Sequence, residues 1–212
     1  MQHLEVKLLN DTGVDDMTPT MLSERMVGLP KQSISKKPWP VYPYHPKVDF
    51  TIAHTGHDIL LKYYVEEAHL RCVNVDINAP VYEDSCVEFF IAFDETGYYN
   101  LEFNCLGIAL VGYGQDRSHR SLLNKNVIRQ IKYEAKLSNE KQGLYQWELM
   151  LIIPVQLFMH HSFNSLSGLV CRANFYKCGD LTQQPHYLSW RAIEAPEPDF
   201  HLPQFFGTLI FQ

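Results

Sequence analysis

The stretch EDSCVEFFIAFDETGYYNLEFNCLG, residues 83–107, decides the fold because hydrophobic and polar side chains alternate along it. Successive side chains on a β-strand point to opposite faces, so a period of two residues predicts a strand with one buried face. Two such runs flank Asp-Glu-Thr-Gly at residues 94–97, which supplies turn chemistry. The stretch therefore predicts an antiparallel hairpin.

Burial of the apolar face limits the register of this hairpin. Phe89 pairs with an apolar residue when it lies opposite either Leu101 or Phe103. A slip of one residue would bring charged side chains into the core, which excludes the odd registers.

The opposite face of the hairpin carries a polar patch. Glu88 lies across from Glu102 in one allowed register and across from Asn104 in the other, with Phe90 beside them. The hairpin thus predicts two acids and an amide gathered on one sheet face.

Length and charge narrow the class of protein. A chain of 212 residues can bury a sizeable core as one domain. With 18 basic and 24 acidic residues the net charge is −6 and no basic cluster occurs, so nucleic acid is not an expected partner. No stretch approaches the ~18 apolar residues of a membrane span, and the first residues do not resemble a signal peptide. We expect a soluble, cytoplasmic protein without membrane association, or a periplasmic or secreted one if a leader has been removed.

The cysteines give no sign of a disulfide framework or of a structural zinc site. They are odd in number and include no C-x-x-C pair, so we expect reduced thiols. The five are Cys72, Cys86, Cys105, Cys171 and Cys178.

Proline and glycine mark the organisation of the N-terminal part. An N-cap, a proline at the first helical position and a glycine stop predict one short helix over residues 18–28. The segment KKPWPVYPYHP, residues 36–46, lacks the backbone donors of a central strand and predicts an extended arm. We therefore divide the chain into residues 1–46, a helix and a proline- and aromatic-rich arm packed on a sandwich, and residues 47–212, the sandwich itself.

Strand patterns follow one another beyond the arm, with a further short helix at residues 154–161. About ten strands and almost no helical periodicity predict an all-β fold, an antiparallel, jelly-roll-like β-sandwich of two sheets. The predicted strands cover residues 47–54, 58–66, 70–78, 86–93, 98–112, 127–137, 144–153, 168–178, 186–191 and 205–211.

The order of several motifs resembles a known family. EDSCVEFFIAF, LEFNCLG, WELMLIIP, LSW and HLPQFFGTLIF occur in the order found in family 9 carbohydrate-binding modules, over roughly Phe50 to Phe211. The resemblance is strongest to the stand-alone family-9-like proteins of polysaccharide-degrading bacteria. It implies a β-sandwich that holds a mono- or oligosaccharide between two tryptophans without catalysis. It implies no cofactor, although some members of the family hold structural calcium.

The resemblance also implies particular site residues. The glutamate of the family's Asp-Ser-Val-Glu motif falls on Glu88, although Cys86 is inserted into that motif here. The two stacking tryptophans correspond approximately to Tyr82 and to Trp190.

The next strand departs from the family pattern. Glu102 and Asn104 stand where the family presents a glutamine and an arginine, so the sugar and the reducing-end preference of known members need not be retained. In NFYKCGD, alternation places two further polar side chains on one strand face. The predicted sugar-binding residues are Tyr82, Glu88, Glu102, Asn104, Asn174, Tyr176 and Trp190.

Three functions stay open from the sequence. The first is non-catalytic carbohydrate binding linked to polysaccharide or oligosaccharide catabolism, in which an aromatic ring covers the C–H face of a sugar and acids and amides bond its hydroxyls. The second is a glycoside hydrolase that uses Glu88 and Glu102, which requires the two directly opposite each other with split pKa values. The third is a protein-interaction module with an apolar surface patch. The plain alternative for both glutamates is solvated charge on an exposed sheet face.

Overall fold

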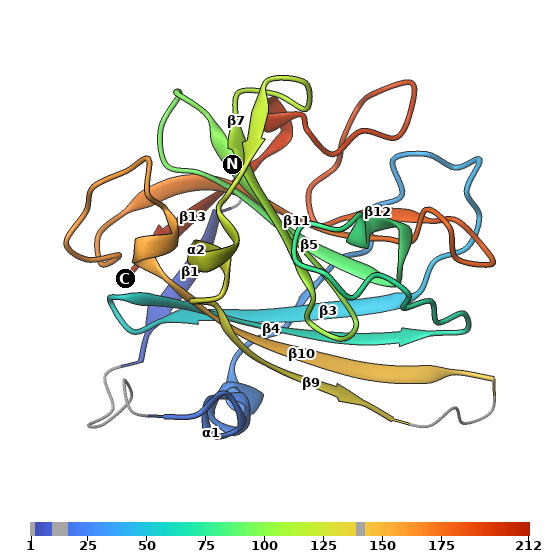
Figure 1. Ribbon diagram of the computed structural model, residues 1–212, viewed down its shortest axis with the longest axis horizontal. Helices are drawn as coiled ribbons and strands as arrows, with labels where there is room; N and C mark the ends of the chain where they lie inside the picture. The colour runs from blue at the N-terminus through green and yellow to red at the C-terminus, as the bar shows by residue number, and fades with distance from the viewer. Residues whose placement is uncertain (1–2, 10–16, 139–142) are drawn as a thin grey trace.

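The computed structural model describes residues 3–9, 17–138 and 143–212. Thirteen strands in these ranges form one continuous sheet that curls into two facing layers (Figure 1). The strands are β1 (His3–Leu8), β2 (Gln32–Ser33), β3 (Lys47–His54), β4 (Asp58–Glu67), β5 (Cys86–Ala92), β6 (Tyr98–Asn104), β7 (Ala109–Gly114), β8 (Arg120–Leu122), β9 (Lys132–Leu137), β10 (Tyr145–Pro154), β11 (Val170–Cys178), β12 (Tyr187–Ser189) and β13 (Gly207–Phe211). The helices are α1 (Pro19–Arg25) and α2 (Lys125–Ile128), with 3₁₀ turns η2 (Met26–Gly28), η3 (Val81–Glu83), η4 (Val155–Leu157) and η5 (Pro203–Phe205).

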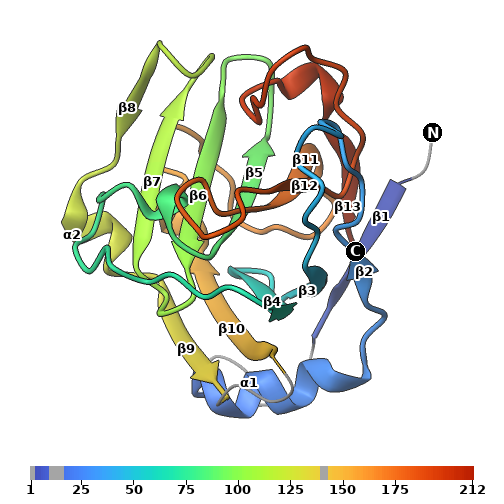
Figure 2. The ribbon, with the colours of Figure 1, turned by 90° about the vertical axis from the view of Figure 1, so that its right-hand side faces the viewer.

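Each layer of the sandwich consists of a run of neighbouring strands in the single curled sheet. The β5 layer runs β8-β7-β6-β5-β11-β13, and the β4 layer runs β1-β3-β4-β10-β9. Figure 2 shows β8, β7, β6 and β5 side by side. The expected β-sandwich is confirmed, and its neighbouring strands are antiparallel except around β1.

The N-terminal segment adds a strand that the sequence analysis did not predict. β1 pairs in parallel with β13 through His3–Val6 and then with β3 through Lys7–Leu8, so it joins the two layers. The alternation of HLEVKL was the available signal. Residues 1–46 therefore contribute to the sheet itself as well as covering it.

The predicted strand at residues 70–78 is wrong. These residues form an irregular loop whose backbone groups are bonded by a side chain instead of a neighbouring strand. The N–H groups of Val73 and Asn74 donate to the carboxylate of Asp84, which is fully buried. A single buried acceptor thus satisfies donors that a sheet would otherwise have to pair.

Two other predicted strands are interrupted. Residues 98–112 contain two strands, because the chain turns at Gly107, which has a φ of 80°. Residues 127–137 begin within α2, which is capped by the side chain of Asn124, and only residues 132–137 are strand. The predicted helix at residues 154–161 shrinks to the 3₁₀ turn η4.

The central hairpin and the N-terminal helix are confirmed. Phe89 lies opposite Leu101, so Glu88 lies opposite Glu102. The side chain of Thr18 caps α1, and a proline occupies its first turn. The helix packs apolar side chains against the outer face of the β4 layer.

The main core fills the space between the layers. Phe175 stacks on both Phe50 and Phe89, with ring centroids 3.9 and 4.9 Å apart. Trp147 is buried in this core, as the alternation of its strand predicts.

A second apolar cluster covers the outer face of the β5 layer. Phe90 and Tyr176 of that face pack with side chains of two irregular segments, residues 36–46 and residues 190–206. The indole N–H of Trp39 donates to the carbonyl of Ala195 at 2.9 Å and ties the two segments together. This sheet face is therefore covered by chain rather than open to solvent.

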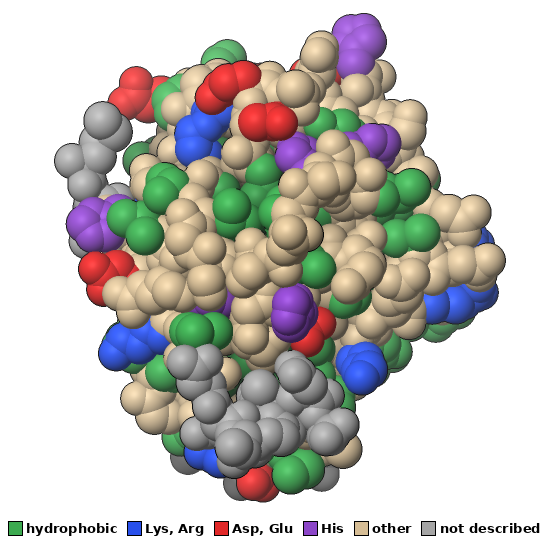
Figure 3. Space-filling view, turned by 90° about the vertical axis from the view of Figure 1, so that its left-hand side faces the viewer, with side chains coloured by type: hydrophobic (Ala, Val, Ile, Leu, Met, Phe, Trp, Pro, Cys, Tyr) green, Lys and Arg blue, Asp and Glu red, His purple; other side chains and the backbone are tan. Residues whose placement is uncertain are grey.

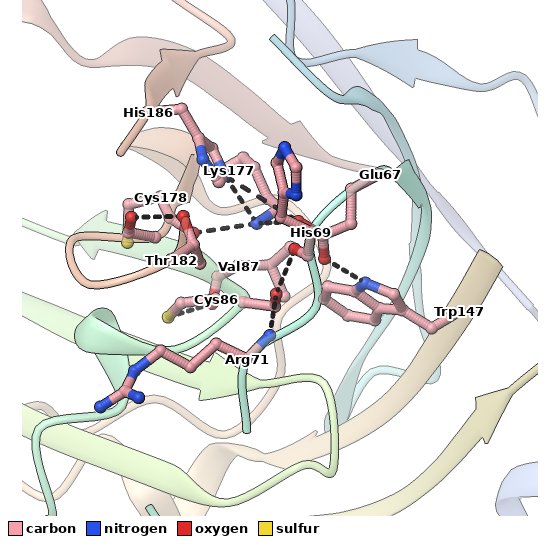
Figure 4. A network of polar contacts seen from close by, with 12 residues as sticks. Glu67, His69, Arg71, Cys86, Val87, Trp147, Lys177, Cys178, Thr182 and His186 are labelled. Atoms are coloured by element: carbon pink, nitrogen blue, oxygen red, sulfur yellow. Dashed lines mark hydrogen bonds and ion pairs between the residues drawn. The ribbon is translucent and has the colours of Figure 1, made fainter. Parts of the chain in front are cut away.

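A buried ion pair lies inside the sandwich at one end (Figure 4). The Lys177 ammonium lies 3.1 Å from the Glu67 carboxylate and donates to Nε2 of His186 at 3.0 Å, and both charged residues are fully buried. The indole N–H of Trp147 donates to Glu67 at 2.6 Å. Burial lowers the pKa of His186 to about 2, so its ring is neutral and accepts from the lysine.

The surface drawn in Figure 3 carries acidic and basic side chains interspersed with hydrophobic and uncharged groups. Among the described residues, no helix is long and apolar enough to cross a membrane.

Candidate functional site

A cavity of about 90 Å³ opens on the outer face of the β5 layer. Its floor is formed by Glu88 of β5, Glu102 of β6 and Cys178 of β11. Its walls come from irregular segments and from the ends of strands, and consist of Tyr82, Arg117, Arg120, Asp180, Tyr187, Pro198, Asp199, Phe200 and His201.

The two glutamates of the floor are almost completely buried, at 3% and 2% exposed. Burial raises the pKa of Glu102 to about 7, against the opposing effects of Arg120 and Asn100. Burial, and then the charge of Glu102, raises the pKa of Glu88 well above its ordinary range. Near neutral pH the pair therefore holds a proton on Glu88, while Glu102 is the carboxyl that ionises.

One carboxylate oxygen of Glu102 has no partner. Oε1 accepts from the amide of Asn100 at 3.0 Å and lies 3.5 Å from Nη1 of Arg120. Oε2 is buried and has no hydrogen-bond partner. Buried polar atoms of folded proteins are nearly always bonded, so an unpartnered acceptor on a residue that lines a cavity indicates a place for a ligand donor.

Arg120 is held in position by a short chain of hydrogen bonds. Its Nη1 donates to Nε2 of His201 at 2.8 Å, and Nδ1 of that ring lies 2.8 Å from the hydroxyl of Tyr98. Burial and the arginine charge lower the pKa of His201 to about 3. The ring is thus neutral, and because Nε2 accepts, Nδ1 carries the proton and donates to Tyr98.

The aromatic walls are fixed from behind. Phe200 stacks face to face on Tyr176, with centroids 4.2 Å apart and planes 7° apart, and the Tyr176 hydroxyl donates to the carbonyl of Phe200. Tyr187 meets Phe200 edge-on at 6.1 Å and hydrogen-bonds Asp180, whose pKa burial raises to about 6. These rings offer apolar faces to the cavity in fixed orientations.

Three of the predicted site residues, Tyr82, Glu88 and Glu102, line this cavity. Tyr176 lies behind it and supports Phe200. The structure thus brings together the acids that the hairpin alternation predicted and one of the two expected aromatic positions.

The two predicted amides act on the backbone instead. Asn104 donates to the carbonyl of Asn74 and to Asp84, at 2.8 and 3.1 Å, and thereby holds the loop that follows β4. Asn174 accepts from the backbone N–H of Arg191 at 2.9 Å. Neither amide lines the cavity, because both are already bonded to neighbouring chain segments.

Trp190 lies in the core and not at the cavity. It is 8% exposed, and its ring meets Phe50 and Phe175 edge-on at 6.2 and 5.5 Å. The guanidinium of Arg191 covers the ring at 3.9 Å. This position does not support the stacking role expected for Trp190, because the ring is nearly buried and does not line the cavity.

Sequence reasoning missed the side chains that build the walls. Arg120 lies on the three-residue strand β8, in a stretch where no strand was predicted. Asp180, Phe200 and His201 lie in irregular segments without periodic pattern. The cluster of aromatic residues and a histidine at positions 200–206 was the one available signal.

A larger hollow of about 440 Å³ lies on the outer face of the β4 layer. Several of its polar side chains are paired, since Glu148 lies 2.8 Å from Lys62 and Gln146 donates to Glu66 at 2.7 Å, whereas the buried hydroxyl of Tyr64 has no hydrogen-bond partner. We assign the site to the smaller cavity, because there the unpartnered atom belongs to one of two buried carboxyl groups with raised pKa values.

One group of described residues has the composition of a metal site. The ligand atoms of Cys86, Glu88 and Cys178 lie within 4.8 Å of one another. Calcium takes six to eight oxygen ligands, so this donor set does not fit calcium. Structural calcium, which the family resemblance implies for some members, stays a prediction.

Comparisons with known proteins agree on the family. The model of carbohydrate-binding family 9 matches residues 16–211. A crystal structure from Bacteroides uniformis, described as a "putative carbohydrate-binding protein", is 40% identical, with a TM-score of 0.87 and coverage of 100% of this chain and 99% of that one. No curated protein sequence matches the chain.

Two more distant structures share the fold. Both are a family 9 carbohydrate-binding module from Caldicellulosiruptor kristjanssonii, one in complex with glucose and one with cellotriose, and each is 12% identical to this chain. Their TM-scores are 0.62 and 0.59, over 100% of this chain and 96% and 94% of theirs. The motifs, the sandwich and the family match over nearly the whole chain agree, and the chain belongs to carbohydrate-binding family 9.

Proposed function

We propose that this protein binds one sugar ring, without catalysis, in the cavity floored by Glu88 and Glu102. The observation that carries the proposal is the buried, unpartnered Oε2 of Glu102 in that floor. A sugar hydroxyl is a donor of the right size for this acceptor, and the charge of the carboxylate strengthens the bond.

The neighbouring groups suit the rest of a pyranose. A protonated Glu88 both donates and accepts, so it can bond a second hydroxyl of either role. Tyr82, Tyr187 and Phe200 offer apolar ring surface for the C–H groups of the sugar. Since Trp190 is buried in the core, we assign to these rings the sugar-stacking role that the family resemblance implies for tryptophans.

The size of the cavity limits the ligand. At about 90 Å³ it is far smaller than the ~300–1,000 Å³ of a drug-sized ligand site. We therefore expect the terminal or sole ring of a sugar to enter, while further rings of an oligosaccharide lie outside. Glucose and cellotriose, the ligands of the Caldicellulosiruptor complexes, are suitable first probes.

Calorimetric titration of a panel of mono- and oligosaccharides tests the proposal. Glu102→Gln is expected to weaken binding about 10- to 100-fold, because a hydrogen bond to a charged group contributes roughly 1.5–3 kcal/mol. Glu66→Gln, on the larger hollow of the β4 layer, is the matched control and should leave the affinity unchanged. Equal weakening by both variants, or no saturable binding of any sugar in the panel, would contradict the proposal.

A glycoside hydrolase is the second candidate, because Glu88 lies directly opposite Glu102 and the two carboxyl groups have different pKa values. A protonated and an ionised carboxyl side by side are the acid and the nucleophile of a retaining enzyme. Chromatography of the sugars after long incubation separates the two functions. Intact sugar supports binding alone, whereas cleaved product that disappears with Glu88→Gln would assign catalysis to the pair.

A further inference from the structure

We propose that Cys86, Cys178 and Glu88 bind a thiophilic divalent cation of the zinc type at the floor of the cavity. The two thiol sulfurs and a carboxylate oxygen all lie within 4.8 Å of one another. This inference does not rest on sugar binding, because the cation itself is the ligand.

Strand pairing sets the three donors side by side. Cys86 of β5 lies directly opposite Cys178 of β11, and Glu88 is two residues further along β5 on the same face. Lys177, the neighbour of Cys178 in the chain, points to the other face and into the ion pair of the core (Figure 4). Because the donors stand on two adjacent inner strands of the layer, β5 and β11, their spacing is fixed by the sheet and not by a loop.

The donor atoms are weakly engaged in the free protein. The thiol of Cys178 donates to Oε1 of Glu88 at 3.0 Å, and the thiol of Cys86 lies 3.7 Å from the carbonyl of Val87 and hydrogen-bonds the thiol of Cys178. A cation takes the place of the two thiol protons and of the proton on Glu88, and all three pass to solvent as the bonds to sulfur and oxygen form. No strong internal bond has to be broken for this exchange.

Thiolate and carboxylate are both ordinary zinc ligands, at ~2.3 Å from sulfur and ~2.0–2.2 Å from oxygen. Around a tetrahedral ion such donors lie roughly 3.4–3.8 Å apart, so Cys178 and Glu88, now 3.0 Å apart, would have to separate slightly, while any longer distance within the 4.8 Å group would close. Glu88 and Cys178 line the cavity, which provides the entry path. Three protein ligands leave a fourth position for solvent around a tetrahedral ion.

The burial of the thiols makes them unreactive without a metal. Burial raises the pKa of both Cys86 and Cys178, so both are protonated as free thiols. A bound metal ion deprotonates a coordinating thiol outright. The chain also provides an internal comparison, because Cys72 and Cys105 hydrogen-bond each other but belong to no group of three metal-binding side chains among the described residues.

The test is a spectroscopic titration of the reduced, metal-free protein with Co²⁺ and, separately, with Cd²⁺. We expect one equivalent per chain, a Co²⁺ spectrum of a four-coordinate ion with two thiolates, and a thiolate-to-cadmium charge-transfer band. Cys86→Ser and Cys178→Ser should each abolish these bands, whereas the double variant Cys72→Ser, Cys105→Ser should retain them. Circular dichroism checks the fold of each variant. The wild-type Co²⁺ spectrum tests the proposal even if a variant fails to fold.

The proposal is overturned by a wild type that shows no thiolate band, by bands that persist in Cys86→Ser, or by bands lost from the Cys72, Cys105 double variant. The same protein is titrated with sugars in the presence of a chelator, which removes any bound cation. This titration tests sugar binding alone, so failure of the cation proposal is distinguished from failure of the sugar proposal.

Discussion

Ionisation of Glu102 is expected to destabilise the folded protein as the pH rises, and Glu102→Gln is expected to remove this effect. The side chain is 2% exposed, and burial raises its pKa from 4.5 to about 7. A raised pKa means that the folded state binds the proton more tightly than the unfolded chain. The contribution of the group to stability is therefore fully present below pH 4.5 and is lost as the pH rises through 7.

The magnitude follows from the two pKa values. The gap between 4.5 and about 7 is about 2.5 pH units, and each unit corresponds to ~1.4 kcal/mol, which gives about 3 kcal/mol. The raised value already contains the attraction of Arg120, which acts in the opposite direction. Repulsion between an ionised Glu102 and Glu88 adds to the loss, since the charge of Glu102 raises the pKa of Glu88.

Urea unfolding of the wild type and Glu102→Gln at pH 4, 6 and 8 measures this difference. Glutamine has the size of the protonated carboxyl, so the variant should match the wild type near pH 4 and exceed its stability by about 3 kcal/mol at pH 8. Glu95→Gln is the control, because its side chain is 87% exposed and a surface pair contributes only ~0–1 kcal/mol. Parallel stability curves for the wild type and Glu102→Gln, or a less stable variant at pH 8, would refute the reasoning.

Three further predictions concern the fold. Lys177→Met should lower the free energy of unfolding by about 3–5 kcal/mol, because Glu67 keeps an uncompensated buried charge. In urea titrations the double variant with Glu67→Gln should regain part of the lost stability. A Lys177→Met protein as stable as the wild type would contradict this. Gly107→Ala should lower the thermal midpoint, because φ is +80° and a Cβ would collide with the ring of Tyr133, and an unchanged midpoint would argue against that turn. Phe175→Ala should cost about 3–5 kcal/mol in chemical denaturation, since its ring is fully buried between two others, and a loss below ~1 kcal/mol would be inconsistent with this packing.

The sequence predicted the floor of the site because alternation is a local signal. The period of two residues alone places Glu88 and Glu102 on one face, and burial of Phe89 limits the register to even shifts. The structure selects Leu101 as the partner of Phe89 from the two allowed choices. The chain turns at Gly107, so β6 ends earlier than predicted, and the alternation of side chains does not reveal the positive φ of this glycine.

The walls of the site could not be predicted in the same way. Arg120, Asp180 and Phe200 come from segments without periodicity, and only the pairing of β7 with β8 and the second apolar cluster bring them to the floor. Trp190 was placed by correspondence with a family motif, which gives a position in the chain but not the side of the sheet to which a ring points. Its burial against Phe175 is a property of the packed sandwich.

The most direct test of the account is a crystal structure of the protein with a bound sugar, such as glucose or cellotriose. We predict a pyranose ring in the cavity of the β5 layer, with a hydroxyl within hydrogen-bond distance of Oε2 of Glu102 and C–H groups against Tyr82, Tyr187 or Phe200. A sugar bound in the hollow of the β4 layer, with the cavity at Glu88 and Glu102 left to solvent, would contradict the account.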